Sequence, residues 1–254
     1  NCIKKNTKGI YIESPSNPLL KIVDMQLISK MAKSKKLWTM IDNTFASPVN
    51  QNPIDFGIDV VIHSATKYLG GHSDISAGAV ISSKDRINRV YELAKSLGGT
   101  LSEFSAWLLE RSIKTLPIRV WQQNENAMGL ANFLNSHSLI SKVYYPGLIS
   151  HEGHEIAKRQ MKGFGGMLSI ELHPSVKPEL FLKNLKIIKP VMSLAGIEST
   201  ANYPKLTSHY SLTDKERSLQ AISDQLIRLS AGIESIIDLK NDIDNSLKCS
   251  ENEN

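Results

Sequence analysis

Short apolar runs alternate with stretches of helical periodicity in the first half of this 254-residue chain. Apolar residues recur every three to four positions over residues 24–35 and 84–96, which predicts amphipathic helices there. Between them, short apolar runs predict strands at residues 10–13, 37–41, 60–63 and 78–82. Strands that alternate with helices are typical of a mainly parallel sheet flanked by helices, so the first half is predicted to be an α/β domain.

The pattern changes near Pro117. Residues 107–114 have helical spacing, which the proline is expected to interrupt. A longer helical pattern over residues 120–136 predicts a helix that bridges two domains. A smaller α+β unit is then predicted from two strands and a final helix, at residues 142–145, 166–172 and 233–247. We therefore expect a large domain over residues 1–118 and a C-terminal domain, which includes the bridging helix, over residues 119–254.

Composition narrows the classes of protein to which the chain can belong. The sequence is 41% hydrophobic and 22% charged, as in ordinary globular proteins. Its apolar runs are far shorter than the ~18 residues of a membrane span, and it does not open with a secretory signal. Cys2 and Cys249 lie near opposite ends, which does not suit a disulfide framework. We expect a cytoplasmic protein with no membrane partner.

Charge and histidine spacing argue against two further kinds of site. The net charge of +5 and a pI near 9.0 come from scattered lysines, without a nucleic-acid-binding motif, so we expect no nucleic acid partner. His151, His154 and Glu155 resemble metal ligands, but the two histidines lack the spacing of a zinc-binding helix. We expect no metal site.

The most informative segment is the predicted strand that begins at Val60 and leads into Ser64, Thr66 and Lys67. An ammonium group at the edge of an apolar strand is desolvated, which favours the neutral amine that can form a Schiff base. The two hydroxyl groups lie within one short turn and suit a phosphate. On its own, this segment is more commonly a solvated turn.

A carboxylate occupies the equivalent place one predicted strand earlier. Asp42 follows the run at residues 37–41, and the carboxyl end of a parallel strand faces the ligand crevice of an α/β sheet. Such a carboxylate keeps a pyridine nitrogen protonated, which makes the ring an electron sink. Asp42 alone could equally end a strand as a turn former. Together, the lysine, the hydroxyl groups and the carboxylate predict a site for pyridoxal phosphate.

The longer motifs match a known family. Residues 13–18 read ESPSNP, residues 41–45 IDNTF and residues 63–74 HSATKYLGGHSD. The match continues through residues 145–148, 163–167 and 226–234. These segments closely resemble the Cys/Met-metabolism, or transsulfuration, family of pyridoxal phosphate enzymes. The resemblance implies fold type I, similar to aspartate aminotransferase, with a partial large domain of mainly parallel sheet and a smaller C-terminal α+β domain.

The resemblance also implies roles for individual residues around the cofactor. Lys67 is similar to the family's Schiff-base lysine, which acts as a general base once it is freed, and Asp42 to the partner of the pyridinium nitrogen. Ser64 and Thr66 are similar to its phosphate ligands. Asn17 lies where the family has an asparagine near the cofactor's phenolic oxygen and the substrate carboxylate.

Two further residues are implied for the substrate. Arg228 is similar to the arginine that grips the α-carboxylate through a bidentate pair, although the residue alone could equally pair with an acid at a strand edge. Ser193 lies where the family has a serine beside that arginine. Met192 replaces a glutamate found in many members that act on cystathionine or activated homoserine. An apolar residue there could favour a thioether substrate or β-elimination.

The family implies a C–S lyase or transferase, and the sequence leaves its reaction open. We favour an enzyme similar to cystathionine γ-synthase or γ-lyase, with cystathionine β-lyase and methionine γ-lyase as alternatives. An aminotransferase shares the lysine and aspartate but not the long match around Lys67. Roughly the first third of the family's chain has no counterpart here, so a non-catalytic fragment is a further alternative. The parent enzyme is expected to be a homotetramer, a dimer of dimers.

Overall fold

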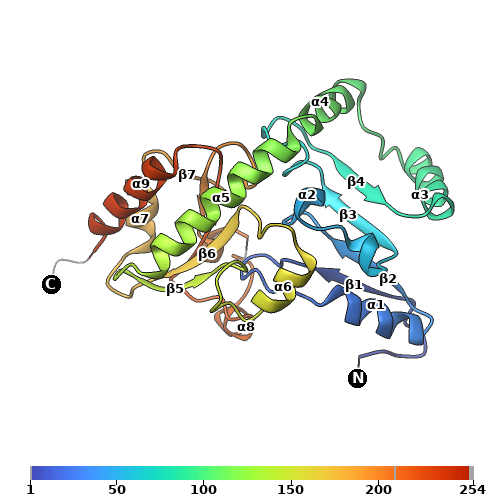
Figure 1. Ribbon diagram of the computed structural model, residues 1–254, viewed down its shortest axis with the longest axis horizontal. Coiled ribbons are helices and arrows are strands. Elements are labelled where there is room, and N and C mark those ends of the chain that lie inside the picture. Colours follow the sequence, from blue (N-terminus) through green and yellow to red (C-terminus); the bar gives the residue numbers. More distant parts are fainter. Residues whose placement is uncertain (1, 209, 252–254) are drawn as a thin grey trace.

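The computed structural model describes residues 2–208 and 210–251 and contains two sheets joined by a long helix (Figure 1). The first sheet has the order β1-β2-β3-β4 and the second the order β5-β6-β9-β8-β7. The strands of the first sheet are β1 (Gly9–Glu13), β2 (Trp38–Asp42), β3 (Val60–Ser64) and β4 (Gly78–Ile81). Those of the second are β5 (Ile140–Tyr144), β6 (Met167–Leu172), β7 (Lys189–Pro190), β8 (Thr200–Asn202) and β9 (Leu226–Ser230).

Helices precede, join and cover these sheets. The first half contains α1 (Met25–Ser34), α2 (Ser47–Asn50), the 3₁₀ helix η1 (Pro53–Phe56), α3 (Lys84–Leu97) and α4 (Glu103–Ile113). Helix α5 (Leu116–Asn135) connects the two sheets (Figure 1). The second half contains α6 (His154–Gln160), α7 (Pro178–Asn184), η2 (Pro204–Leu206), α8 (Asp214–Leu219) and α9 (Ile236–Lys248). None of the helices in the described residues is long and apolar enough to cross a membrane.

The first sheet is parallel except at one edge. Strands β1, β2 and β3 run in the same direction, whereas β4 is antiparallel to β3. In this register Glu13 lies beside Asp42, and Asp42 lies beside Ile62. The carboxyl ends of three neighbouring strands therefore meet at one edge, which gathers short segments that are separate in the sequence.

The two sheets differ in how much apolar surface they bury. A small buried cluster beside the first sheet contains Met25, Ile41, Ile58 and Val61. The second sheet, α5 and α9 share a much larger cluster, to which β9 contributes Ile227 and Leu229. Successive side chains of a strand point to opposite faces of the sheet. Arg228, between these two residues, therefore points to the opposite face.

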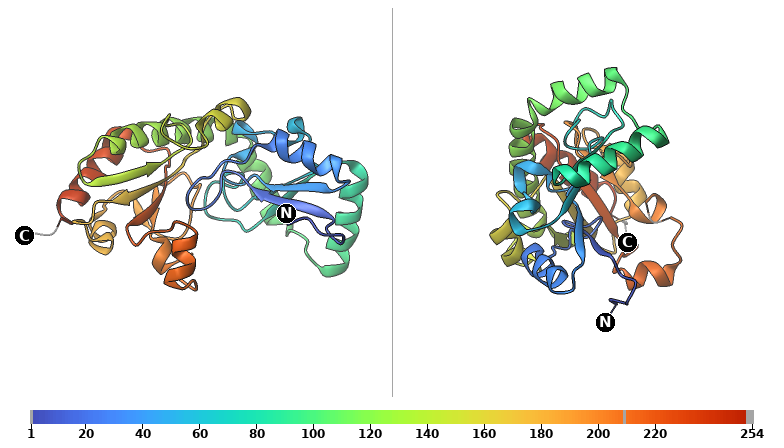
Figure 2. Two further views of the ribbon diagram at one scale, coloured as in Figure 1. Left: turned by 90° about the horizontal axis from the view of Figure 1, so that it is seen from below. Right: turned by 90° about the vertical axis from the view of Figure 1, so that its right-hand side faces the viewer.

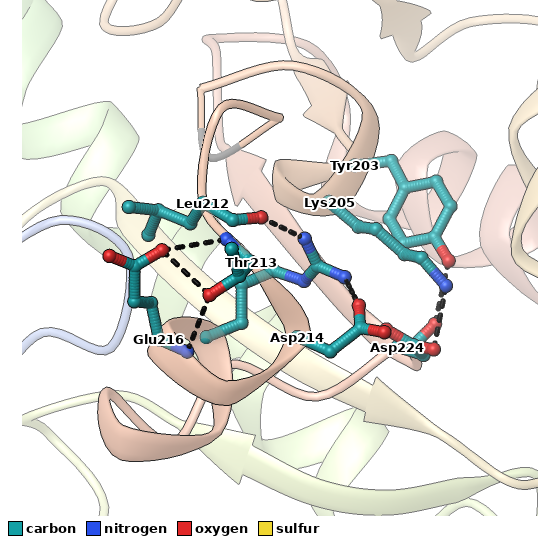
Figure 3. A network of polar contacts seen from close by, with 8 residues as sticks. Tyr203, Lys205, Leu212, Thr213, Asp214, Glu216 and Asp224 are labelled. Atoms are coloured by element: carbon teal, nitrogen blue, oxygen red, sulfur yellow. Dashed lines mark hydrogen bonds and ion pairs between the residues drawn. The ribbon is translucent and has the colours of Figure 1, made fainter.

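Polar contacts hold the segment that leads into β9 (Figure 3). Helix α8 begins with a capping box, in which the Glu216 amide donates to Thr213 Oγ1 at 3.3 Å and the Thr213 amide donates to Glu216 Oε2 at 2.8 Å. Lys205 forms an ion pair with Asp224 at 2.6 Å, and the Tyr203 hydroxyl donates to the Asp224 carbonyl at 2.8 Å. These contacts fix the approach to the strand that carries Arg228.

The predicted strands of the first half are all present, each within one residue of its expected ends. The long helix begins at Leu116, four residues earlier than expected, because Pro117 lies in its first turn, where the missing N–H costs nothing. Strands β7, β8 and β9 were not predicted as strands. The predicted boundary between residues 118 and 119 lies inside helix α5, and the division into two domains at that point stays a prediction.

Candidate active site

Asp42 ends β2 and is held by the segment that follows it. Its Oδ1 accepts a hydrogen bond from the Thr44 amide at 2.9 Å. Thr44 Oγ1 accepts one from the Ser64 amide at 2.8 Å, so one residue links the ends of β2 and β3. Burial and the nearby Asp42 carboxylate both raise the pKa of Glu13. Thr44 and Glu13 were missed from the sequence, although they lie in the IDNTF and ESPSNP motifs.

Lys67 lies in the turn that follows β3. Its amide donates to the Ser64 carbonyl at 3.1 Å, and the Gly70 amide donates to the Ala65 carbonyl at 2.8 Å. Burial lowers the pKa of Lys67, and the positive charge of Arg228 lowers it further. Both effects favour the neutral, nucleophilic amine.

The two hydroxyl groups on either side of Ala65 are in different situations. Thr66 Oγ1 accepts a hydrogen bond from the Ala77 amide at 3.0 Å and donates to the Ala77 carbonyl at 3.3 Å. It therefore ties the turn to the chain entering β4, and its hydrogen would have to turn to reach a phosphate. The Ser64 hydroxyl has no hydrogen-bond partner in the described part of the chain, so it is the readier donor.

Arg228 comes from the second sheet and is 3% exposed. Its Nη1 donates to Asn17 Oδ1 at 3.1 Å and its Nη2 donates to the Met192 carbonyl at 3.0 Å. Its Nε has no partner among the described residues, and burial lowers its pKa to about 10. A buried guanidinium without a carboxylate partner carries an uncompensated charge, which an acidic ligand would satisfy.

Asn17 and the segment around Ser193 complete this side of the site. Because Asn17 Oδ1 faces Arg228, its Nδ2 group remains to donate to another group. The Ser193 carbonyl accepts a hydrogen bond from the Thr200 hydroxyl at 2.9 Å, and its own hydroxyl makes none with the described residues. Met192 contacts Arg228 through its carbonyl, whereas 61% of the residue is exposed. The backbone of Met192 was missed as a ligand of Arg228.

The structure thus brings two groups of residues together. Asp42, Ser64, Thr66 and Lys67 lie at the carboxyl edge of the first sheet. Arg228 reaches Asn17 from the second sheet and is close enough to Lys67 to lower its pKa. A desolvated lysine, a carboxylate at a neighbouring strand end and a free hydroxyl fit pyridoxal phosphate. This arrangement defines an α/β protein of the fold type I class.

Comparisons with known proteins agree with that class. The chain is 48% identical over 246 residues to a cystathionine beta-lyase of Lactococcus lactis subsp. cremoris, covering 96% of this chain and 65% of that protein. It is 44% identical over 247 residues to a cystathionine gamma-lyase of Bacillus subtilis, covering 97% and 65%. The crystal structure of a cystathionine gamma-lyase from Lactobacillus plantarum complexed with L-serine superposes with a TM-score of 0.95 at 40% identity, covering 98% of this chain and 66% of that one.

A sequence model of the family described as "Cys/Met metabolism PLP-dependent enzyme" matches residues 1–248. The chain belongs to this family of pyridoxal phosphate-dependent enzymes, and the fold class expected from the sequence is confirmed. It spans 65% of the length of the two relatives named above.

Proposed function

We propose that this chain forms the cofactor-binding edge and the substrate-carboxylate site of a C–S lyase or transferase of sulfur amino-acid metabolism. The observation that carries the proposal is Arg228. It is buried, its Nε has no partner among the residues that the structure describes, it contacts Asn17, and it lies close enough to Lys67 to lower the pKa of the lysine. An α-amino acid would place its carboxylate on Arg228 and its amine toward Lys67.

In this proposal each residue on the cofactor side has a physical role. Lys67 would hold the cofactor and, as a neutral amine, would remove a proton from Cα of the substrate. Asp42 keeps the ring nitrogen protonated. Ser64 would donate to the phosphate, and Thr66 would do so if its hydrogen turned away from Ala77. When bound, pyridoxal phosphate supplies the electron sink for the carbanion at Cα.

On the substrate side, Arg228 orients the α-carboxylate, and Asn17 directs its Nδ2 group to the carboxylate or to the cofactor. We propose that the hydroxyl of Ser193 lies beside them. Because the carboxylate is fixed, the Cα–H bond is held toward Lys67, and the chemistry at Cβ or Cγ depends on where the side chain of the substrate lies.

The bond that is broken separates the candidate reactions. A leaving group on Cβ departs directly after the proton is removed from Cα, whereas one on Cγ needs a second proton transfer at Cβ. We propose γ-synthase or γ-lyase chemistry on cystathionine or activated homoserine, with cystathionine β-lyase and methionine γ-lyase activities as alternatives. The relatives support cleavage at Cβ and at Cγ alike, since one is named a cystathionine beta-lyase and another a cystathionine gamma-lyase.

The setting of the parent enzyme is also a proposal. We propose a cytoplasmic homotetramer that takes a small amino-acid substrate and binds neither nucleic acid nor membranes. Its support is the family membership of the chain. Size-exclusion chromatography with light scattering on the completed protein tests the assembly, and a stable monomer would contradict it.

The first experiment adds pyridoxal phosphate to the purified chain, and to the chain completed with the N-terminal third of the Lactococcus relative. Visible absorbance and borohydride reduction report a bond to Lys67, and peptide mass spectrometry locates it. Lys67→Ala should abolish both signals. Lys84→Ala, at an exposed lysine, is the matched control and should leave them unchanged. Labelling of any other lysine would contradict the proposed site.

A product assay then decides the reaction. The completed protein is incubated with cystathionine, and the released thiol is identified by chromatography. Cleavage of the Cβ–S bond releases homocysteine, whereas cleavage of the Cγ–S bond releases cysteine. If neither the chain nor the completed protein takes up the cofactor, the proposed function is wrong. If only the completed protein does, this chain alone is a non-catalytic part of the enzyme.

A further inference from the structure

Helix α5 presents a row of buried polar side chains that donate to the backbone of other segments. Arg119, Gln123 and Asn126 follow one another at spacings of four and three residues, so they lie on one face of the helix. Each is at most 5% exposed. Placing three polar side chains in the interior is costly unless hydrogen bonds compensate, and each of them reaches a different loop.

Arg119 holds the turn that carries Lys67. Its Nη1 donates to the Tyr68 carbonyl at 2.9 Å, and its Nη2 to the Leu69 carbonyl at 3.5 Å and the Ser112 carbonyl at 2.9 Å. The guanidinium forms no ion pair with any described residue. All of its N–H hydrogen bonds go to neutral acceptors.

Gly71 shows how closely Arg119 approaches this turn. The glycine has a φ of +72°, which is a left-handed conformation. A Cβ atom at this position would overlap the guanidinium of Arg119. The turn and the arginine are therefore packed directly against each other.

The next two residues of the row hold the loops of the substrate side. Gln123 Nε2 donates to the Gly196 carbonyl at 2.7 Å, in the loop that follows Ser193. Asn126 Nδ2 donates to the Gly232 and Glu234 carbonyls at 2.9 and 2.8 Å, just after the strand of Arg228. One helix face thus reaches the three segments that carry Lys67, Ser193 and Arg228.

The three segments are also joined to one another. The Ile197 amide donates to the Gly71 carbonyl at 3.0 Å, and the Ile233 amide donates to the Ile197 carbonyl at 2.9 Å. The Ala195 amide donates to Ser230 Oγ at 2.7 Å. These contacts link the three segments to one another around the site, and α5 contacts all three. We call the three linked segments and α5 the frame.

We propose that Arg119 and Gln123 are positioning residues, which set the separation between the lysine turn and the substrate loop from successive turns of α5. Arg119 acts on the position of Lys67, and Gln123 on the loop of Met192 and Ser193. Neither touches the reacting atoms. The roles of Lys67 and Ser193 rest on the proposed function, whereas the frame itself is a property of the chain without ligand.

The two residues should therefore have separable effects. Arg119→Lys keeps the charge but loses the fork of donors, so it loosens mainly the turn at residues 64–72. Gln123→Met keeps the approximate volume but loses the donor, so it loosens mainly the loop at residues 192–199. Arg111→Lys, at an exposed arginine of α4, is the matched control.

Amide hydrogen exchange of the unliganded chain, read by mass spectrometry, tests the frame directly. We expect exchange to rise about tenfold at residues 64–72 in Arg119→Lys and at residues 192–199 in Gln123→Met, the effect of about one lost hydrogen bond. The other segment should change much less, and Arg111→Lys should match the wild type. Equal changes in both segments, or none, would overturn the proposal. If Arg119→Lys does not fold, Gln123→Met alone decides by the same criterion.

Ligand binding to the completed protein gives the second readout. Arg119→Lys should raise the Kd for pyridoxal phosphate about tenfold, and Gln123→Met should raise KM for the amino acid about tenfold with kcat within twofold of the wild type. An equal loss of kcat in both variants contradicts separate positioning. If the wild type takes up no cofactor but the exchange pattern is as expected, the proposed function fails and the frame stands.

Discussion

The two sheets of this molecule carry the two halves of the candidate site but are supported very differently. Every residue of β9, including Arg228, is buried, and the apolar face of the second sheet packs on α5 and α9. The cluster beside the first sheet is small, a second one lies at the edge of that sheet around the lysine turn, and α3 has no buried residue at all. Figure 2 shows α3 at the outer end of the first sheet, away from the second.

This difference shows two ways of fixing a functional side chain. Arg228 is fixed by the strand on which it lies, because a central strand in a large core cannot shift without disturbing its neighbours. Lys67 lies on a turn beyond a strand end, where backbone hydrogen bonds and the side chain of Arg119 hold the chain. Apolar packing supports both segments, since Ala65, Tyr68 and Leu69 of the lysine turn belong to a buried cluster with α5, and the lysine turn has the polar contacts of Arg119 in addition.

The largest expected effect compares two fully buried isoleucines, one in each sheet. Ile170→Ala should lower the free energy of unfolding by about 4 kcal/mol, because it leaves a cavity within a large cluster. Ile41→Ala should cost about 2 kcal/mol, because the smaller cluster around it can collapse onto the space. Urea unfolding followed by circular dichroism measures both, and equal losses would remove the contrast between the sheets.

Asp242 tests whether polar contacts also support the second half. Its carboxylate accepts hydrogen bonds from the amides of Lys186, Ile187 and Ile188 at 2.7, 3.0 and 2.9 Å. Asp242→Ala leaves these donors without their acceptor and should cost about 3 kcal/mol in urea unfolding. Asp238→Ala, at an exposed aspartate of the same helix, should cost at most about 0.5 kcal/mol. A similar loss in both variants would show that the buried carboxylate has no special role.

His63 makes the first sheet sensitive to acid. It is 4% exposed, and burial lowers its pKa from 6.5 to about 4, with the Asp42 carboxylate acting in the opposite direction. Between these values the unfolded chain binds more protons than the folded one, so the contribution of His63 is fully present above pH 6.5 and is lost as the pH falls toward 4. The expected loss at pH 5 is about 2 kcal/mol.

Urea unfolding of the wild type and of His63→Leu at several pH values measures this contribution. The variant should lack that part of the pH dependence, while the part due to His151, whose pKa burial also lowers, should remain. An unchanged slope between pH 7.5 and pH 5 in the variant would contradict the assignment to His63.

The smallest expected effect is at the outer end of the first sheet. Leu93 on α3 is 63% exposed, so Leu93→Ala removes little buried surface and should change the free energy of unfolding by less than about 0.5 kcal/mol. The same urea titration measures it. A loss of about 2 kcal/mol would show that α3 packs on the chain in solution, and the contrast between the sheets would weaken.

Much of the first half could be predicted because its signals are local. The apolar runs and helical spacing depend on neighbours a few residues away, and these placed every strand of the first sheet. Ser64, Thr66 and Lys67 lie within one turn, so their proximity followed from the sequence alone. The periodicity of α3 also predicted the helix, but it could not show that the apolar face of the helix would have no buried residue.

The second half and the frame around the site depended on contacts that no local pattern encodes. Residues 200–202 and 226–230 are strands because they pair with each other, and β9 also pairs with β6, far away in the sequence. Arg119 and Gln123 read as ordinary residues of a long helix until the structure placed the carbonyls of Tyr68 and Gly196 against them.

The sequence by itself determined the reactive groups of the candidate site, which are the lysine, the carboxylate, the hydroxyl groups and the arginine, together with the family that these motifs identify. Only the tertiary structure decided that Arg228 meets Asn17 across 211 residues, that the backbone of Met192 binds the same guanidinium, and that α5 spans both sides of the site. The reason is physical. Residue type and local spacing fix the reactivity and the secondary structure of a segment, whereas the separation of distant segments is set by the packing of the whole chain.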